Sequence, residues 1–315
     1  MKMPKVFVPT GAWNYRAGVT AEEVIASARR AEAAGIDGLF AGDHVTFHGT
    51  GNDGLINLAA VAAHTERVLL QTSVYLLALR HPTPVALQVA LLDQLARGRL
   101  ILGIGIGGED PDEWWACGVD PKTRARRTDE AMQILRSLWT REETTFEGKY
   151  FQLRNVRMQP KPFRDDGVPM WVGGRSDAAV RRAARYGDGY TGIWISPRRF
   201  REIQELLAQF AAEAGRSDVR FQFGMQIWLG VDRDEAKARE KVARRMEGFY
   251  RIPFERFERY VPYGPPEKVA EFIMQYVELG CEHVNLVAAD RSQDAVLESA
   301  LQVREALRSM CGAAA

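Results

Sequence analysis

The chain has 315 residues, 46% hydrophobic and 26% charged, which is typical of a soluble globular protein. A formal net charge of +1 gives no general attraction to nucleic acid or anionic membranes, and the longest apolar runs are too short to span a bilayer. Its three cysteines, Cys117, Cys281 and Cys311, form no CxxC pair, which argues against a disulfide framework or a zinc knuckle. With no signal-peptide pattern after Met1, we expect a cytoplasmic protein.

Strand-like and helix-like segments alternate along the whole chain. The predicted strands are Lys5–Val8, Gly38–Ala41, Val68–Ser73, Leu100–Ile104, Met170–Gly173, Gly189–Ile195, Phe221–Leu229 and His283–Val287. The predicted helices are Ala21–Ala34, Gly54–His64, Pro84–Ala96, Thr123–Trp139, Asp177–Arg185, Arg198–Ala214, Asp234–Glu247, Pro266–Leu279 and, after the last strand, Gln293–Arg308. Alternation of this kind indicates a parallel sheet. Eight units in a chain of 315 residues fit a closed (β/α)8 TIM barrel of the α/β class better than an open sheet.

Local signals set some of these boundaries. Thr20 and Glu23 form a predicted capping box at the start of the first helix. In the third helix Thr83 can serve as the cap, Pro84 suits the first helical position, and Gly98 suits the stop.

Two connections are longer than a barrel needs. Residues 141–168 contain TFEGKYFQLRNV, which predicts a hairpin around Gly148, and residues 248–265 are rich in aromatic residues and arginine. We therefore expect insertions after the fourth and seventh units, and such insertions are often lids or substrate walls. No linker divides the chain, so we expect one domain over residues 1–315.

The fourth predicted strand runs into a glycine-rich loop, and Gly103, Gly105 and Gly108 satisfy G-x-G-x-x-G. A dinucleotide site would need these glycines to open a helix directly, with an acidic residue about 20 positions further on. Glu109-Asp110-Pro111 intervenes here, so we favour a barrel strand end at which Gly107 and Gly108 admit a flat ring or a phosphate.

Asp43-His44 follows the second predicted strand, so His44 is well placed to act on a bound ring; the alternative is a histidine that only hydrogen-bonds within its loop. His48 lies four residues later, the spacing of two helical metal ligands. The glycines at 49 and 51 disfavour a helix there, and we expect no metal site.

Two further motifs each have a functional and a structural interpretation. Glu109 ends the glycine run and is a candidate for proton transfer, or it is a solvated residue beside a helix start formed by Asp110, Pro111 and Glu113. Arg80, in the sequence RHP, could bind an anion or could pair with an acidic neighbour.

A second glycine motif follows the fifth predicted strand. The run Gly173-Gly174-Arg175-Ser176-Asp177 opens a helix, where exposed amides with Arg175 and Ser176 would form a phosphate cradle. The alternative is an ordinary tight turn with a Ser or Asp cap.

Several of these motifs occur together, in this order, in one known family. They are AGDH at 41–44, RHP at 80–82, ALLDQLARGRLILGIGIGG at 90–108, RRTDEAMQILRSLW at 126–139 and PMWVGGRS…AARYGDGY at 169–190. The set covers most of the chain, which thereby resembles the luciferase-like flavin and deazaflavin oxidoreductases. That resemblance implies a (β/α)8 barrel with insertions, usually dimeric, that binds either FMN with a separate reductase or the deazaflavin coenzyme F420.

The resemblance also implies roles for individual residues. Asp43-His44 looks like the pair of the F420 branch, whose histidine lies near the reactive ring carbon, and Glu109 falls where some members carry an acid/base carboxylate. Ser73-Val74 matches a non-prolyl cis peptide behind the ring. Residues similar to the phosphate-side loops are Gly107, Gly108, Gly173, Gly174, Arg175 and Ser176.

We therefore expect an F420-dependent oxidoreductase that transfers hydride between the deazaflavin and a small organic substrate, with His44 and Glu109 as catalytic residues. The alternatives are an FMN-dependent monooxygenase that uses O2, a non-catalytic flavin-binding protein and a barrel hydrolase. The hydrolase is disfavoured because the strand FQFGMQIWLG carries no carboxylate to face Glu109. Expected partners are the substrate, a second copy of the chain and a separate flavin or F420 reductase, and we expect neither nucleic acid nor membrane.

Overall fold

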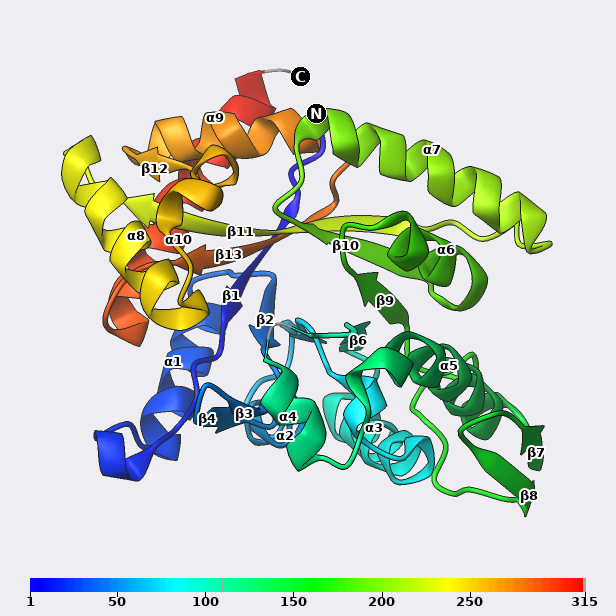
Figure 1. Cartoon of the computed structure of the whole chain (residues 1–315). Coiled ribbons are helices and arrows are strands. Elements are labelled where there is room, and N and C mark those ends of the chain that lie inside the picture. The colour runs from blue at the N-terminus through cyan, green and yellow to red at the C-terminus, as the bar shows by residue number, and fades with distance from the viewer. Residues whose placement is uncertain (109, 314–315) are drawn as a thin grey trace.

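The computed structural model describes residues 1–108 and 110–313, and its centre is a barrel of parallel strands (Figure 1). In chain order the eight barrel strands are β1 (Lys5–Pro9), β2 (Gly38–Ala41), β5 (Leu69–Thr72), β6 (Leu100–Ile104), β9 (Met170–Gly173), β10 (Gly189–Ile193), β11 (Gln222–Val231) and β13 (His283–Ala288). Neighbouring strands pair in parallel, and the pairing of β10 with β11 closes the ring. The predicted (β/α)8 barrel is confirmed.

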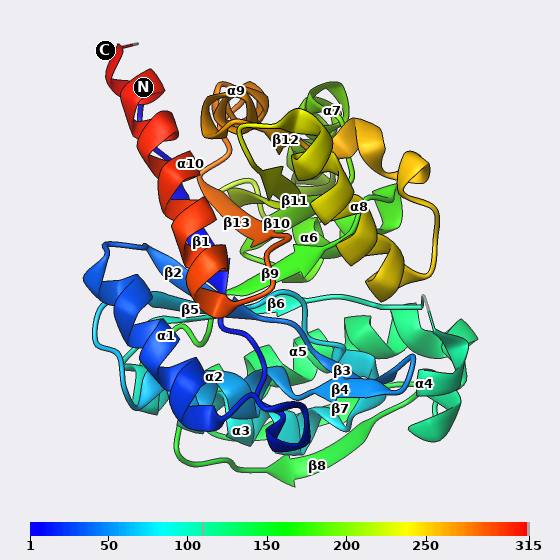
Figure 2. The same cartoon turned by 90° about the vertical axis from the view of Figure 1, so that its left-hand side faces the viewer.

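Helices cover the outside of the barrel, as the two views in Figures 1 and 2 show. They are α1 (Ala21–Ala33), α2 (Gly54–Ala62), α3 (Pro82–Ala96), α5 (Arg124–Thr140), α6 (Asp177–Tyr186), α7 (Pro197–Glu213), α9 (Pro266–Val277) and α10 (Gln293–Ala313). The capping box of Thr20 and Glu23 is present at the start of α1. Within the described residues, no helix has the length and apolar character needed to cross a membrane.

The start of α3 differs from the prediction. The helix begins at Pro82, not Pro84, and its cap is His81, whose Nδ1 accepts a hydrogen bond from the Thr83 amide at 3.2 Å. Pro82 then takes the first helical position, where its missing N–H costs nothing. Histidine is an uncommon N-cap residue and threonine is a common one, which is why the sequence favours Thr83 as the cap.

Aromatic rings fill the amino-terminal end of the barrel. The ring of His283, at the start of β13, stacks on Phe7 and lies against Trp171, with ring centroids 5.1 and 4.6 Å apart. Burial lowers the pKa of His283 to about 3, so this imidazole is neutral and acts as a core side chain.

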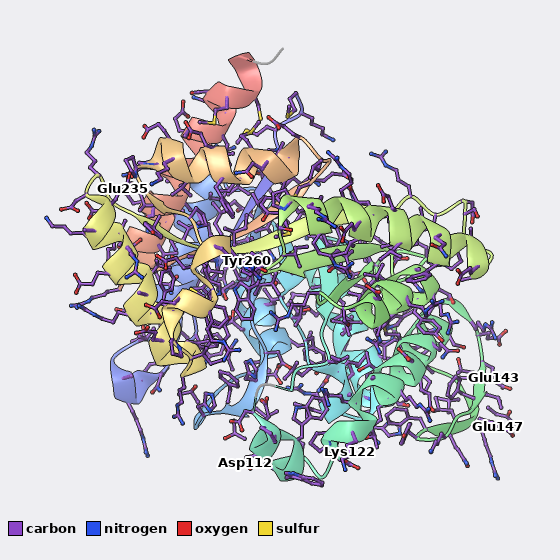
Figure 3. All side chains as sticks on the ribbon, turned by 45° about the horizontal axis from the view of Figure 1, so that its top comes forward. Asp112, Lys122, Glu143, Glu147, Glu235 and Tyr260 are labelled. Carbon is purple, nitrogen blue, oxygen red and sulfur yellow. The ribbon has the colours of Figure 1, made fainter. Side chains whose placement is uncertain are left out.

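The first long connection is not a lid. It contains the hairpin of β7 (Thr144–Glu147) and β8 (Gln152–Val156), and it joins the end of α5 to the start of β9. The Glu130 carboxylate of α5 accepts hydrogen bonds from three amides at the turn, so the hairpin packs on the outer helices. Figure 3 shows Glu147 at the outer edge, far from Glu235 at the start of α8.

The second long connection is larger than the sequence suggested. We expected the helix at 234–247 to belong to the barrel, but α9 takes the place between α7 and α10, and α8 (Glu235–Tyr250) belongs to the extra segment. The segment also contains two short 3-10 helices, Phe254–Arg256 and Glu258–Tyr260, and the strand β12 (Tyr263–Gly264). The sequence of an amphipathic helix at this position cannot be distinguished from that of a barrel helix. Hydrophobic periodicity shows that one face is buried, but it does not show which surface covers that face.

Candidate active site

Asp43 lies in the turn that follows β2, and its side chain is fully buried. Its carboxylate accepts two hydrogen bonds from the Arg80 guanidinium, at 2.7 and 2.9 Å. The amides of Leu76 and Gly54 donate to the same carboxylate at 3.0 and 3.3 Å. Burial raises the pKa of Asp43, and these donors act against the rise. Asp43 therefore anchors the loops around the mouth of the barrel, the opening at the carboxyl ends of its strands. Arg80 pairs with an acidic neighbour, which was the second of its two interpretations. A contact of Asp43 with a cofactor stays a prediction.

His44 is held by a carboxylate that we did not assign to the site. It begins β3 (His44–Phe47), which pairs with β4 (Thr50–Asn52), and its Nδ1 lies 3.1 Å from Oε2 of Glu113 on α4 (Pro111–Ala116). The Val45 amide donates to the same carboxylate at 2.6 Å. Burial by itself would raise the pKa of Glu113, but the hydrogen bonds of His44 and the backbone amides bring it below the ordinary value. Glu113 is thus an ionised acceptor that fixes the His44 ring.

A second pair joins the same two elements. The Asp110 carboxylate accepts a hydrogen bond from the His48 amide at 2.9 Å and lies 3.4 Å from the imidazole Nδ1. His44 and His48 therefore lie in a hairpin, each with a carboxylate partner, and the helical metal-ligand spacing does not apply. The two contacts tie the hairpin to α4, and Figure 1 shows these elements side by side.

Aromatic rings from the β3–β4 hairpin, from β11 and from α8 pack together beside His44. The Phe47 ring stacks on His44 with centroids 4.3 Å apart, and Phe249 of α8 packs on Phe47 at 5.1 Å. Trp228 of β11 lies 6.0 Å from Phe249. The second long connection therefore contributes Phe249 to an aromatic cluster beside His44, and its role as a substrate wall stays a prediction.

His44 also borders a cavity of about 390 Å³. The other side chains that line it include Trp13, Asn52, Asp53 and Arg80. About a quarter of the His44 side chain is exposed (26%), so the ring is held on one side and open on the other. This is the arrangement that a group transferring a proton to a small ligand requires.

Ser73 and Val74 follow β5 at the floor of the mouth, and the peptide bond between them is cis, as the resemblance implied. The Ser73 hydroxyl donates to Oε1 of Gln226 at 2.7 Å and accepts from Nδ2 of Asn285 at 3.1 Å. The same Asn285 amide donates to Gln71 at 3.1 Å. Side chains from three strands therefore form a polar floor below the mouth.

Glycines at the ends of β6 and β9 make room for the Val74 side chain beside this floor. A methyl group on Gly105 would overlap Val74, and one on Gly173 would come within 2.8 Å of it. Gly107 and Gly108 have φ values of +50° and +121°, which favour glycine. Gly105 and Gly173 thus serve packing directly, whereas contacts of Gly107 and Gly108 with a ligand stay a prediction.

The predicted phosphate cradle is the start of α6. Gly174 has a φ of +147°, and Ser176 is the N-cap, with its hydroxyl accepting from the Ala179 amide at 3.4 Å. The Arg175 guanidinium lies over the Trp194 ring, 5.4 Å from its centroid. The capping role that we gave as the alternative for Ser176 is therefore present, and phosphate binding stays a prediction.

Of the predicted catalytic residues, Glu109 lies outside the described residues. Glu113 is the main candidate residue that the sequence did not assign to the site, because its position near Asp110-Pro111 explained it as part of a helix start. The one available signal was its acidic side chain close to the glycine run.

The chain is similar to a known protein family, to curated proteins and to solved structures. Residues 5–260 match the family model "Luciferase-like monooxygenase". An F420-dependent glucose-6-phosphate dehydrogenase from Beutenbergia cavernae is 33% identical over 298 residues, which cover 85% of this chain and 88% of that protein. A 4-hydroxyprotoasukamycin monooxygenase from Streptomyces nodosus subsp. asukaensis is 31% identical over 213 residues, covering 64% and 57%.

The fold has close counterparts among solved structures. An F420-dependent secondary alcohol dehydrogenase in complex with an F420-acetone adduct superposes with a TM-score of 0.82 at 23% identity, covering 98% of this chain and all of that one (100%). The fold places His44 at the carboxyl end of β2, and barrel enzymes carry their active sites at this end of the strands. The chain belongs to the luciferase-like monooxygenase family and is an oxidoreductase of that family.

Proposed function

We propose that this protein is an F420-dependent oxidoreductase that moves a hydride between the deazaflavin and a small organic substrate. The observation that carries the proposal is the His44–Glu113 pair beside an open cavity at the barrel mouth. Two of the compared proteins are named as F420-dependent dehydrogenases, which supports F420 as the cofactor. The dehydrogenase names favour a substrate that carries a hydroxyl group or the corresponding carbonyl.

The residues at the mouth can supply the proton transfer that this reaction needs. When bound, F420 supplies the hydride chemistry. The Glu113 carboxylate favours the tautomer with the proton on Nδ1 of His44, which leaves Nε2 as an acceptor. His44 can then take a proton from a substrate hydroxyl, or return one to a carbonyl in the reverse direction. While His44 carries the extra proton, the Glu113 carboxylate stabilises the charged imidazole.

The loops that would hold the cofactor have the right chemistry for it. Two buried donors near the predicted phosphate-side loops, Nε of Arg124 and the Thr191 hydroxyl, have no hydrogen-bond partner in the described part of the chain. Arg124 lies beside Gly108, and the backbone of Thr191 accepts a hydrogen bond from the Gly174 amide. The residues proposed to bind F420 are Asp43, Ser73, Val74, Gly107, Gly108, Gly173, Gly174, Arg175 and Ser176.

Titration with both cofactors tests the proposal. We expect F420 to bind more tightly than FMN. When a panel of alcohols and carbonyl compounds is then added to the F420 complex, turnover should change the absorbance of the deazaflavin ring. Arg175→Ala should weaken F420 binding by about 1–3 kcal/mol if the guanidinium binds the phosphate. Tighter binding of FMN together with oxygen-dependent turnover would refute the F420 assignment.

That second outcome corresponds to the other candidate, an FMN-dependent monooxygenase that receives reduced flavin from a separate reductase. It is favoured by the S. nodosus relative, which is named as a monooxygenase. In such an enzyme the same His44–Glu113 pair would act as a base. We expect a cytoplasmic homodimer for either cofactor, and an F420 reductase as the separate partner if F420 is used.

A further inference from the structure

A second and larger cavity, of about 880 Å³, adjoins the site. It lies between α8, the connection from β13 to α10 and the β3–β4 hairpin, which contributes Thr50. Figure 2 shows α8 and this hairpin on the same side of the molecule. The volume falls in the range of small-molecule sites.

The lining of this cavity is strongly basic. Lys241, Arg244, Arg245 and Arg291 line it, and Asp290 is the one carboxylate among its described lining residues. The whole chain carries a net charge of only +1, so this concentration of cations is local.

The one carboxylate in the lining is already neutralised. Nζ of Lys241 lies 2.6 Å from Oδ1 of Asp290 and donates to the Val231 carbonyl at 3.0 Å. The Ser299 hydroxyl donates to the other oxygen of Asp290 at 2.7 Å. The negative charge of Asp290 is therefore already paired with Lys241 and does not neutralise the other cations of the cavity.

Two arginines of the lining have no charge partner among the residues that the structure describes. Arg244 pairs with Glu240 one turn earlier on α8. Neither Arg245 nor Arg291 has an ion pair or a hydrogen bond to a side chain within residues 1–108 and 110–313. Arg245 on α8 and Arg291 in the connection from β13 to α10 thus bring two guanidinium groups from different elements to one cavity. The donors of a guanidinium match the geometry of a carboxylate or phosphate.

One apolar side chain lies between this cavity and His44. Phe249 lines the cavity, and its ring lies 6.5 Å from the His44 ring in an edge-to-face arrangement. An apolar wall therefore leads from the two arginines to the imidazole.

We propose that this cavity binds an anionic group of the substrate, a phosphate or a carboxylate, with Arg245 and Arg291 as its ligands. The uncharged part of the substrate lies along Phe249 and brings its hydroxyl or carbonyl group to His44. This assignment rests on the proposed function, and it makes the substrate class a hydroxy or oxo compound with an anionic group at one end.

Binding of inorganic phosphate tests the site without any turnover. Isothermal titration of the cofactor-free protein should show phosphate binding that falls by about tenfold or more in the double variant Arg245→Gln/Arg291→Gln. A matched double variant, Arg154→Gln/Arg201→Gln, removes the same charge from exposed positions on β8 and α7 and should bind phosphate like the wild type. Equal loss in both double variants, or no binding to the wild type, would overturn the proposal.

Paired substrates then connect the site to the reaction. We expect an alcohol that carries a phosphate or carboxylate to have a lower KM than its neutral analogue, and Arg245→Gln/Arg291→Gln to raise the KM of the anionic member alone by about 10- to 100-fold. A rise in the Kd of F420 in that variant would instead place the cofactor tail in the cavity and overturn the proposal. If F420 does not bind at all, the proposed function fails while the phosphate titration still reports on the site.

Discussion

His44 is the residue on which the proposed chemistry depends, and its partner lies 69 positions away in the sequence. The sequence could indicate the histidine because it stands at the end of a strand, where parallel barrels place their catalytic residues. It could not indicate Glu113, because the contact depends on how a hairpin and a short helix dock together. Glu113 is also buried, so its carboxylate is committed to His44 and to the amides of Val45 and Thr46.

Replacement of the histidine should remove proton transfer and leave binding. We expect His44→Asn to lower kcat by roughly 10²–10⁴-fold, the usual contribution of a positioned acid or base, with little change in F420 affinity. Single-turnover absorbance of the cofactor measures the first quantity, and titration measures the second. Near-normal turnover would show that His44 serves only its loop.

Removal of the Glu113 charge should act through His44. We expect Glu113→Gln to lower kcat by roughly 10–100-fold with little change in KM, because the imidazole loses the acceptor that fixes its tautomer. The pH profile of kcat should shift in this variant, and Glu113→Asp should recover part of the rate. A lower melting temperature with an unchanged pH profile would contradict the positioning role.

The same carboxylate should make stability depend on pH. The pKa of Glu113 is lower in the folded protein than its ordinary value of 4.5, so its ionised form stabilises the fold above that value. This contribution is lost as the pH falls through the folded pKa. Calorimetric melting temperatures should therefore drop less on acidification from pH 6 towards pH 3 in Glu113→Gln than in the wild type. Parallel curves would contradict this linkage.

At the scale of the elements, the sequence predicted the barrel well and its insertions less well. Strands such as Gly38–Ala41 are recognised from a short apolar run between turn residues, and the capping box at Thr20 is a local signal. The local sequence does not determine the position of α8, because this helix packs beside β11 and β12 instead of in the ring of helices around the barrel. The glycine motif was correctly assigned to a strand end, but the neighbour that requires Gly105 is Val74 on another strand end.

This packing gives a stability prediction. Gly105→Ala should lower the free energy of unfolding by about 1–3 kcal/mol, because the new methyl group overlaps Val74. The loss should be smaller in a Val74→Ala background, as a double-mutant cycle in denaturant would measure. Gly248→Ala on α8, where nothing lies within 4 Å of the added methyl group, is the control and should not destabilise. Additive effects of Gly105→Ala and Val74→Ala would show that the two sites are not in contact.

At the scale of the whole molecule, α3 carries a row of exposed leucines that do not pack in the barrel core. Leu87, Leu91 and Leu95 follow one another at four-residue spacing on α3 and are 37%, 51% and 46% exposed. On the neighbouring α2, Ile56 is 62% exposed. Residues four apart share one face of a helix, so the three leucines form a continuous surface. Such a surface fits the homodimer that the family resemblance implies.

We therefore expect the wild-type protein to be a dimer that Leu91→Glu converts to a monomer, because a carboxylate at the centre of the row would be buried without a partner. Sedimentation equilibrium measures the mass of both forms. Ile252→Glu adds the same charge at an exposed apolar residue outside α2 and α3, so this control should remain dimeric. Since Leu91 is exposed within one chain, the folded monomer should keep its far-ultraviolet circular dichroism. A monomeric wild type, or a Leu91→Glu variant that is still dimeric, would contradict the assignment of this row of leucines to the dimer.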